Sequence, residues 1–296
     1  MNLDKAFSLK TVLVATDFSR SASAALRYAQ TIARARNAAL VLVHVIDPVG
    51  YAFPVGAPAS ISRDEVARVE VAQIEQTVRQ QGIQVHSEIE TGVICERILE
   101  AVRDHSASLL VLGTEAKTRA GRAALGVLAR QLLVHCPCPI LTVPPETKAR
   151  LSVAGLWGSV LVAMDFSPSS LAAITCAQGI VERQLIVVHT VCCGKEANCS
   201  ICLGRLRLLA PFNESHTAPI EHFVPSGNPV ATTEEFAKRF RADLIVLGAP
   251  SIELSAGEME SSTIMQIISG VHCPVLVVPA DAAIEAKHTM EAAVAN

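Results

Sequence analysis

The sequence predicts two α/β domains, each with a five-stranded parallel sheet covered by helices on both faces. Short apolar runs alternate with segments of helical periodicity, which is typical of strand–helix–strand units with right-handed crossovers. Half of the 296 residues are apolar, so each half of the chain can bury a core. Landmark residues also recur at a constant spacing of 135 positions. These pairs are Gly92 and Gly227, Gly113 and Gly248, Cys138 and Cys273, and Pro144 and Pro279.

The start of the chain is duplicated as well. Residues Val12–Ser19 recur as Val160–Ser167, 148 positions later. A repeat of this length indicates a duplicated domain, and two domains of about 140 residues have the usual domain size. We expect a first domain at 1–145, a linker at 146–157, a second domain at 158–280 with a cysteine-bearing segment, and a tail at 281–296.

Capping residues and apolar runs predict the helices and strands of the first half. Ser19 is the expected N-cap of a helix that runs to about Arg36. Ser62–Glu65 is a capping box, and the helix that it starts is expected to bury Val66, Val69, Ile74 and Val78 on one face. We expect strands at 11–16, 39–46, 83–89, 109–112 and 140–143, and further helices at 93–105 and 127–134.

The second half repeats this order with one shortened segment. His44 and Gly92 are 48 positions apart, whereas His189 and Gly227 are 38 apart. We expect strands at 160–164, 185–190, 220–224, 244–247 and 275–278. Helices are expected at 169–182, at 229–240 and from about residue 262.

Composition excludes several classes of protein. The net charge of −3 and the lack of a long basic run argue against a nucleic-acid partner. Residues 1–10 lack the apolar core of a signal peptide, and no apolar run has the length of a membrane span. Nine cysteines are an odd number in a core-forming chain, so we expect reduced thiols and a cytoplasmic location.

The segment Leu109–Pro144 predicts an anion site. An apolar strand ends at Gly113, a polar basic loop follows, and a helix starts near Gly126. Glycines let backbone N–H groups approach a phosphate, and a helix N-terminus offers unpaired donors. Asp17 ends the first strand, where open α/β sheets place ligand-binding residues. The alternative is that Asp17 and Asp165 only cap the helices that follow them.

With these pieces in place, the chain resembles a tandem universal stress protein over residues 10–280. The resemblance lies in Val12–Ser19, Val41–Val45, Gly92, Leu109–Thr114 and Cys138–Pro144, and in their counterparts in the second half. It implies Rossmann-like domains (adenine nucleotide alpha hydrolase-like) with strand order 3-2-1-4-5. It also implies that the last strands of two domains can pair. A tandem chain would then form an intramolecular pseudo-dimer, with a homodimer as a further expectation.

The resemblance also implies a nucleotide site in the first domain. Asp17 would contact the ribose and the backbone of Val43 would read the adenine. The phosphate loop of the family, Gly-x₂-Gly-x₉-Gly-Ser/Thr, matches Gly113 and Gly126 but has Ala116 and Val127 at its other two positions. The remaining residues expected at this site are Arg119 and Leu128. A weaker second site would consist of Asp165, Val188, Gly248, Ser261 and Ser262.

Loop charge separates the two sites. Residues 113–126 carry Lys117, Arg119 and Arg122 against Glu115, a net charge of +2. Residues 248–262 carry three glutamates and no base, a net charge of −3. A unit charge close to a phosphate is worth about 1–4 kcal/mol in a partly solvated site. The expected ligand is therefore ATP, with Mg²⁺ as a companion ion, in the first domain.

A second candidate site is a cysteine cluster. Cys192, Cys193, Cys199 and Cys202 are close in sequence, with His189, His216 and His222 as further donors. Thiolates and imidazole suit tetrahedral zinc, and a dithiol switch is an alternative. The structural interpretation is that these are small buried residues. Cys136, Cys138 and Cys273, at the entry to the last strands, are expected to be structural, and His44 and His189 to be core or pocket-wall residues.

Catalysis has little support in the sequence. There is neither a Gly-x₄-Gly-Lys-Ser/Thr loop nor a Gly-x-Ser-x-Gly elbow, and no residue is indicated as a base, although slow ATP hydrolysis stays open. The leading function is a stress-response or signalling module that binds a nucleotide and protein partners. The two alternatives are an interaction module without nucleotide and a zinc or thiol sensor built on Cys192–Cys202.

Overall fold

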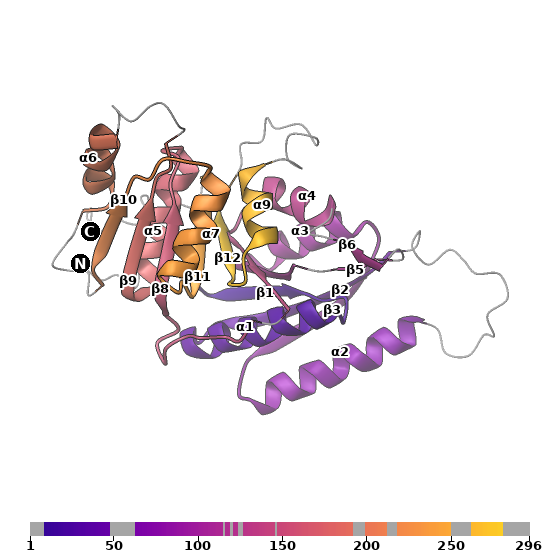
Figure 1. The fold of residues 1–296 in the computed structure, drawn as a ribbon. Helices are drawn as coiled ribbons and strands as arrows, with labels where there is room; N and C mark the ends of the chain where they lie inside the picture. The colour runs from indigo at the N-terminus through magenta and orange to yellow at the C-terminus, as the bar shows by residue number, and fades with distance from the viewer. Residues whose placement is uncertain are drawn as a thin grey trace, which may run out of the picture.

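The computed structural model describes residues 9–47, 63–114, 116–118, 121–123, 127–145, 147–191, 199–211, 218–249 and 262–280. Its centre is one ten-stranded sheet in the order β10-β9-β8-β11-β12-β7-β4-β1-β2-β3 (Figure 1). The two halves of the chain each contribute five neighbouring strands.

The first half has the expected strand order, because β3-β2-β1-β4-β7 is 3-2-1-4-5 counted along the main sheet, and all its pairs are parallel. Its strands are β1 (Thr11–Ala15), β2 (Ala39–Ile46), β3 (Val85–Thr91), β4 (Leu109–Gly113) and β7 (Ile140–Val143).

The second half repeats this arrangement as β10-β9-β8-β11-β12, again with parallel pairs. Its strands are β8 (Trp157–Ala163), β9 (Val181–Val188), β10 (Ile220–Phe223), β11 (Leu244–Gly248) and β12 (Val275–Val278). The predicted α/β fold class is confirmed in both halves.

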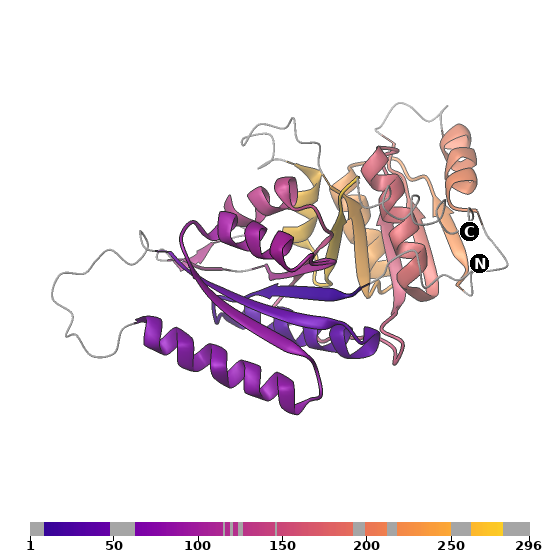
Figure 2. The same ribbon diagram turned by 180° about the vertical axis from the view of Figure 1, so that it is seen from behind.

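Helices cover both faces of this sheet, as Figures 1 and 2 show from opposite sides. One apolar core lies between the sheet and α1 (Arg20–Arg36), α2 (Arg63–Gln80), α5 (Pro168–Ile180) and α6 (Cys199–Leu209). The other core lies under α3 (Ile94–Asp104), α4 (Val127–His135), α7 (Pro229–Arg239) and α9 (Thr263–Gly270). Corresponding helices of the two halves therefore lie on the same face.

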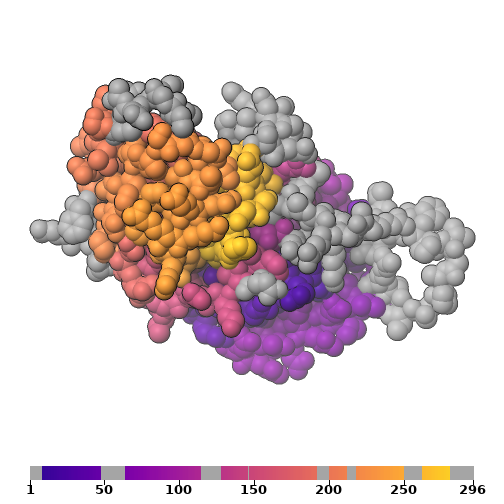
Figure 3. Space-filling view, viewed as in Figure 1, coloured from indigo at the N-terminus to yellow at the C-terminus, as the bar shows by residue number. Residues whose placement is uncertain are grey.

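The last strands of the two halves join the sheet together. β7 pairs antiparallel with β12, with Leu141 opposite Leu276, and the Thr142 hydroxyl donates to the Val275 carbonyl at 3.2 Å. The pairing of last strands that the resemblance implied is therefore made within one chain, and the two halves pack closely in the space-filling view (Figure 3). Because the junction is antiparallel, the carboxyl ends of the strands of each half point to opposite ends of the sheet.

Three expectations are wrong in detail. Val66 and Val69 of α2 are 46% and 56% exposed, and the buried face consists of Ala67, Val71 and Val78 with Ile74 packed beside them. A spacing of three to four residues from Ala67 onward fits one helix face, which the valines at 66 and 69 do not share.

The second difference is an additional hairpin and the third is a helix boundary. The segment after Gly113 includes a short antiparallel hairpin, β5 (Ala116–Thr118) with β6 (Gly121–Ala123), rather than only a loop. α5 ends at Ile180 and β9 begins at once, because Val181 is extended and pairs with Trp157. No helix among the described residues has both the length and the hydropathy that a membrane-spanning segment needs.

Candidate functional site

The carboxyl end of β1 is fixed by a hydrogen-bonded turn at Asp17. The Asp17 carboxylate accepts the Ser19 N–H at 2.9 Å, and the Ser19 hydroxyl accepts the Ala22 N–H at 3.1 Å as the N-cap of α1. The Thr16 hydroxyl accepts the Phe18 N–H at 3.1 Å. Asp17 is thus held between a strand end and a helix start, at the crevice between β1 and β4 where the strand order reverses.

Phe18, the residue after Asp17, packs its ring against His44 next to this turn. Its φ of 59° is in the left-handed region, which a bulky residue seldom adopts. Its ring lies 4.4 Å from that of His44, whose Nδ1 is 2.8 Å from the Thr16 carbonyl oxygen. His44 is buried. The expectation that His44 is a core or pocket-wall residue agrees with this burial.

The second half contains the same turn. Asp165 accepts the Ser167 N–H at 2.9 Å, Phe166 has a φ of 64°, and its ring lies 4.4 Å from that of His189. His189 Nδ1 is 2.8 Å from the Met164 carbonyl oxygen. Burial tends to raise the pKa of Asp165, but hydrogen bonds from Ser167 and Ser170 together lower it below its ordinary value.

Gly113 and Gly248, at the ends of β4 and β11, pack closely against the helices that follow the two aspartate turns. A Cβ added to Gly113 would lie 2.5 Å from the Ser21 carbonyl carbon and 2.8 Å from the Ala22 nitrogen. A Cβ on Gly248 would lie 2.4 Å from the Ser170 nitrogen. Each strand end therefore lies directly against the first turn of the neighbouring helix. This close approach is a structural reason for both glycines that does not require a phosphate.

Val43 and Val188 lie in the sheet rather than at its edge. The Val43 carbonyl accepts the Thr16 N–H at 2.9 Å, and the Val188 carbonyl accepts the Met164 N–H at 2.8 Å. β1 ends at Ala15, which pairs with Val43. Main-chain groups of a strand alternate between its two neighbours, so Val45 is the next residue of β2 to direct its groups toward β1, beyond the end of that strand.

Of the remaining residues expected at the first site, some lie in described elements and others lie outside the described residues. Ala116 belongs to β5, and Val127 is the first residue of α4. Leu128 is partly buried against the core under α4. Arg119 and Gly126 lie outside the described residues. The described part therefore brings Asp17, Gly113 and Thr114 to one edge of the sheet.

At the second site, Ser262 serves as a helix cap. Its hydroxyl accepts the Met265 N–H at 3.4 Å at the start of α9. The Arg205 guanidinium of α6 lies 4.2 Å from the centre of the ring of Phe166, which is the residue after Asp165. Ser261 lies outside the described residues. The Ser169 hydroxyl also donates to the Ala249 carbonyl at 2.8 Å, which ties the chain after Gly248 to α5.

The cysteine cluster falls mostly outside the described residues. Cys192 and Cys193 are not described, nor is the side chain of Cys199 at the start of α6, and Cys202 is half-buried with a free thiol. His222 Nε2 donates to the Ala210 carbonyl at 2.9 Å, and burial lowers its pKa. Cys136 and Cys138 are buried, with their sulfurs 3.6 Å apart.

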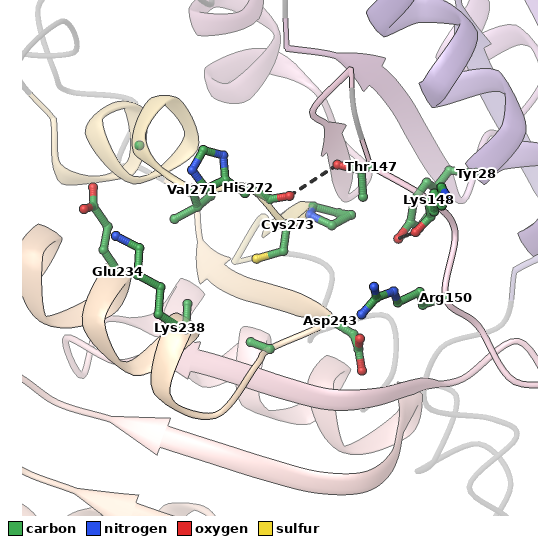
Figure 4. Close-up of a pocket in the computed structure, with 14 residues that line it drawn as sticks. Tyr28, Thr147, Lys148, Arg150, Glu234, Lys238, Asp243, Val271, His272 and Cys273 are labelled. Atoms are coloured by element: carbon green, nitrogen blue, oxygen red, sulfur yellow. Dashed lines mark hydrogen bonds between the residues drawn. The ribbon is translucent and has the colours of Figure 1, made fainter.

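A cavity of about 470 Å³ lies where the segment after β7 crosses to the second half (Figure 4). Its walls include Lys148, Lys238, Asp243 and Cys273, and burial raises the pKa of the Cys273 thiol to about 12, so this thiol is protonated at neutral pH. Asp243 and Cys273 lie just before β11 and β12 and so at the amino ends of these strands, whereas Asp165 and Gly248 lie at the carboxyl ends of β8 and β11. The cavity is therefore separate from the crevice of that half.

One polar cluster was missed by sequence reasoning. His86, Glu88 and His105 bring their side-chain donors within 4.8 Å of one another on the far edge of the first half. The spacing of His86 and Glu88 on one strand face was visible in the sequence, but their meeting with the end of α3 was not.

Comparison with known proteins identifies the family. The model of the universal stress protein family matches residues 8–144 and 208–279. A universal stress protein of Mycolicibacterium smegmatis is 28% identical over 193 residues, which is 60% of this chain and 63% of that protein. One of Thermus aquaticus is 30% identical over 139 residues, 45% of this chain and 98% of that protein. Among solved structures, a universal stress protein from Archaeoglobus fulgidus shares the fold with a TM-score of 0.68 at 18% identity, over 92% of this chain and 97% of its own.

Proposed function

Because the chain belongs to the universal stress protein family, we propose that its first half binds a nucleoside polyphosphate, with ATP as the leading candidate. The site would lie in the crevice at the carboxyl ends of β1 and β4. The protein would then act as a nucleotide-dependent module of a stress response, with the second half as a silent copy.

The observation that carries this proposal is the charge difference between two otherwise equivalent edges. Both edges have the same aspartate turn, the same left-handed phenylalanine and the same close-packed glycine. The chain after Gly113 has a net charge of +2 up to Gly126, whereas the chain after Gly248 has −3 up to Ser262. Each such charge is worth about 1–4 kcal/mol toward a nearby phosphate, so the first edge favours a polyphosphate and the second opposes it.

Named residues have distinct parts in this proposal. Asp17 would accept a hydrogen bond from a ribose hydroxyl. The phosphates would lie at the N-terminus of α4, where the first backbone N–H groups are free of helical partners. Lys117, Arg119 and Arg122 would neutralise phosphate charge.

The main chain would supply the remaining contacts. Ala116 keeps its backbone N–H, and Val127 supplies an N–H but no hydroxyl. Because the Val43 carbonyl is bonded to Thr16, the base would meet the main chain at Val45 instead.

The proposal is tested by analysing what the purified protein holds and what it gains from added ligand. We expect acid-denatured protein to release an adenine nucleotide identifiable by mass, and ATP–Mg²⁺ to raise the melting temperature. Lys117→Glu should weaken ATP binding at least about tenfold, since it changes the loop charge by two units. Glu258→Lys, the matched reversal in the second loop, should leave the affinity of the first site unchanged.

Two other functions stay as alternatives. The replacement of a glycine and a hydroxyl of the family loop by Ala116 and Val127 favours an interaction module that has lost its nucleotide. Protein that is purified empty and gains no thermal stability from ATP–Mg²⁺ would establish that alternative. The zinc or thiol sensor on Cys192–Cys202 is tested by counting free thiols before and after a mild oxidant, with Cys199→Ser and Cys202→Ser as the comparison.

A further inference from the structure

We propose that His86, Glu88 and His105 form a binding site for a divalent transition-metal ion, with zinc as the leading candidate. The site lies on the edge strand β3 and at the end of α3, away from the crevice between β1 and β4. It is independent of the nucleotide proposal, because it shares no residue with it.

Convergence of three donor atoms is the first argument. His86 Nε2 and His105 Nε2 lie 3.1 and 2.7 Å from the same carboxylate oxygen of Glu88, and the three ligand atoms all lie within 4.8 Å of one another. Ligand atoms around tetrahedral zinc lie about 3.3–3.6 Å apart, because each is about 2.0–2.2 Å from the metal. Side-chain movements of about 1 Å would therefore convert the cluster into a coordination shell.

Local structure explains why these side chains meet. His86 and Glu88 are two apart on β3, so both project from the same face of the sheet. On the opposite face, Ser87 meets Glu75 of α2 instead. His105 is the C-cap of α3, whose backbone N–H is bonded to the Ala101 carbonyl. The centres of the two imidazole rings lie 5.4 Å apart, and both rings contact the same oxygen of the Glu88 carboxylate.

The corresponding positions of the second half show how the end of this helix packs against its strand without the same polar side chains. At the spacing of 135 positions, Glu88 corresponds to Phe223 and His105 to Phe240, whereas His86 corresponds to Glu221. Phe240 is likewise the C-cap of α7, bonded to the Phe236 carbonyl. The rings of Phe223 and Phe240 lie 5.3 Å apart and Phe236 packs against both. An apolar cluster thus satisfies the packing at these two positions, so packing alone does not account for the carboxylate of Glu88 and the imidazole of His105.

Donor chemistry and exposure select the kind of ion. Two imidazole nitrogens and one carboxylate are the donor set of zinc and of other late transition metals, whereas Mg²⁺ and Ca²⁺ prefer oxygen donors alone. The His86 side chain is 62% exposed, and those of Glu88 and His105 are each 25% exposed, so an ion can enter from solvent. Three protein ligands would leave a fourth position for water or for a group from another molecule.

The test uses the full-length protein with its thiols kept reduced. Zinc affinity is measured by competition with a chromophoric chelator, for wild type, His105→Phe, His86→Gln and the control His272→Gln, which alters an exposed histidine outside the cluster. Loss of even an outer-shell partner costs about 10- to 100-fold in metal affinity, so each cluster variant should bind at least about tenfold more weakly. The control should match wild type.

Cobalt distinguishes this site from the cysteine segment. Co²⁺ bound by nitrogen and oxygen gives visible ligand-field bands without the thiolate charge-transfer band of a cysteine site. We expect the former in wild type and its loss in His105→Phe. Equal zinc affinity in wild type and both cluster variants, or cobalt bound with a thiolate band alone, overturns the proposal. His105→Phe copies the residue of the second half at the same cap, and if it fails to fold, the exposed His86→Gln decides.

Discussion

Gly113 shows how little room the end of β4 leaves for a side chain. A methyl group there would lie 2.5–2.8 Å from backbone atoms of Ser21 and Ala22, which cannot rotate away. We expect Gly113→Ala to lower the free energy of unfolding by about 1–3 kcal/mol in urea titrations, as overpacking usually does. Gly204→Ala in α6 is the control, because nothing lies within 4 Å of its added methyl. It should stabilise by about 0.5–1 kcal/mol, and a loss of similar size in both variants would refute the steric account.

The lowered pKa of Asp165 predicts that the stability of the fold depends on pH. Its pKa is lowered in the folded protein, so its carboxylate contributes stability above the unfolded pKa and loses it as the pH falls through the folded pKa. Asp165→Asn keeps an oxygen for the Ser167 N–H but removes the charge. The variant should therefore be less stable than wild type at neutral pH, and the gap should close below about pH 4. Because Asp165 is exposed, solvent screens the effect, and a gap independent of pH in urea unfolding would contradict it.

At the scale of elements, α2 offers a matched pair of valines on one helix. Val78 is fully buried against the sheet, whereas Val69 is 56% exposed. Val78→Ala should cost about 2 kcal/mol of unfolding free energy, because it removes two buried methyl groups and leaves a cavity. Val69→Ala should change stability by less than about 0.5 kcal/mol. Similar losses in both variants would mean that another molecule covers the outer face of α2.

Several elements could be predicted because local chemistry determines them. Ser19 caps the helix that follows it, and the apolar runs at 39–46 and 140–143 are strands with those bounds. The buried face of α2 could not be read correctly, because valines occupy both its faces. The cluster of His86, Glu88 and His105 depends on the packing of α3 against β3, which no local pattern encodes. The loop residues of the nucleotide site stay a prediction.

At the scale of the molecule, the pairing of β7 with β12 should make the two halves unfold together. Trp157 is the single tryptophan of the chain and is buried at the start of β8, so its fluorescence reports on the second half. Far-UV circular dichroism reports on both halves. We expect the two unfolding curves to coincide. Thr142→Val, which removes a hydrogen bond across the junction, should shift both by about 0.5–1.5 kcal/mol. Two separated transitions would show that the halves are energetically independent.

The antiparallel seam gives the molecule two opposite poles. The Asp17 turn at the end of β1 lies at one pole and the Asp165 turn at the end of β8 lies at the other, because β7 and β12 run antiparallel between the two halves. The continuous sheet, joined at β7 and β12, is the direct structural connection between these two turns. A ligand bound at the Asp17 turn would therefore make no contact with the Asp165 turn, so one chain could carry one occupied end and one empty end.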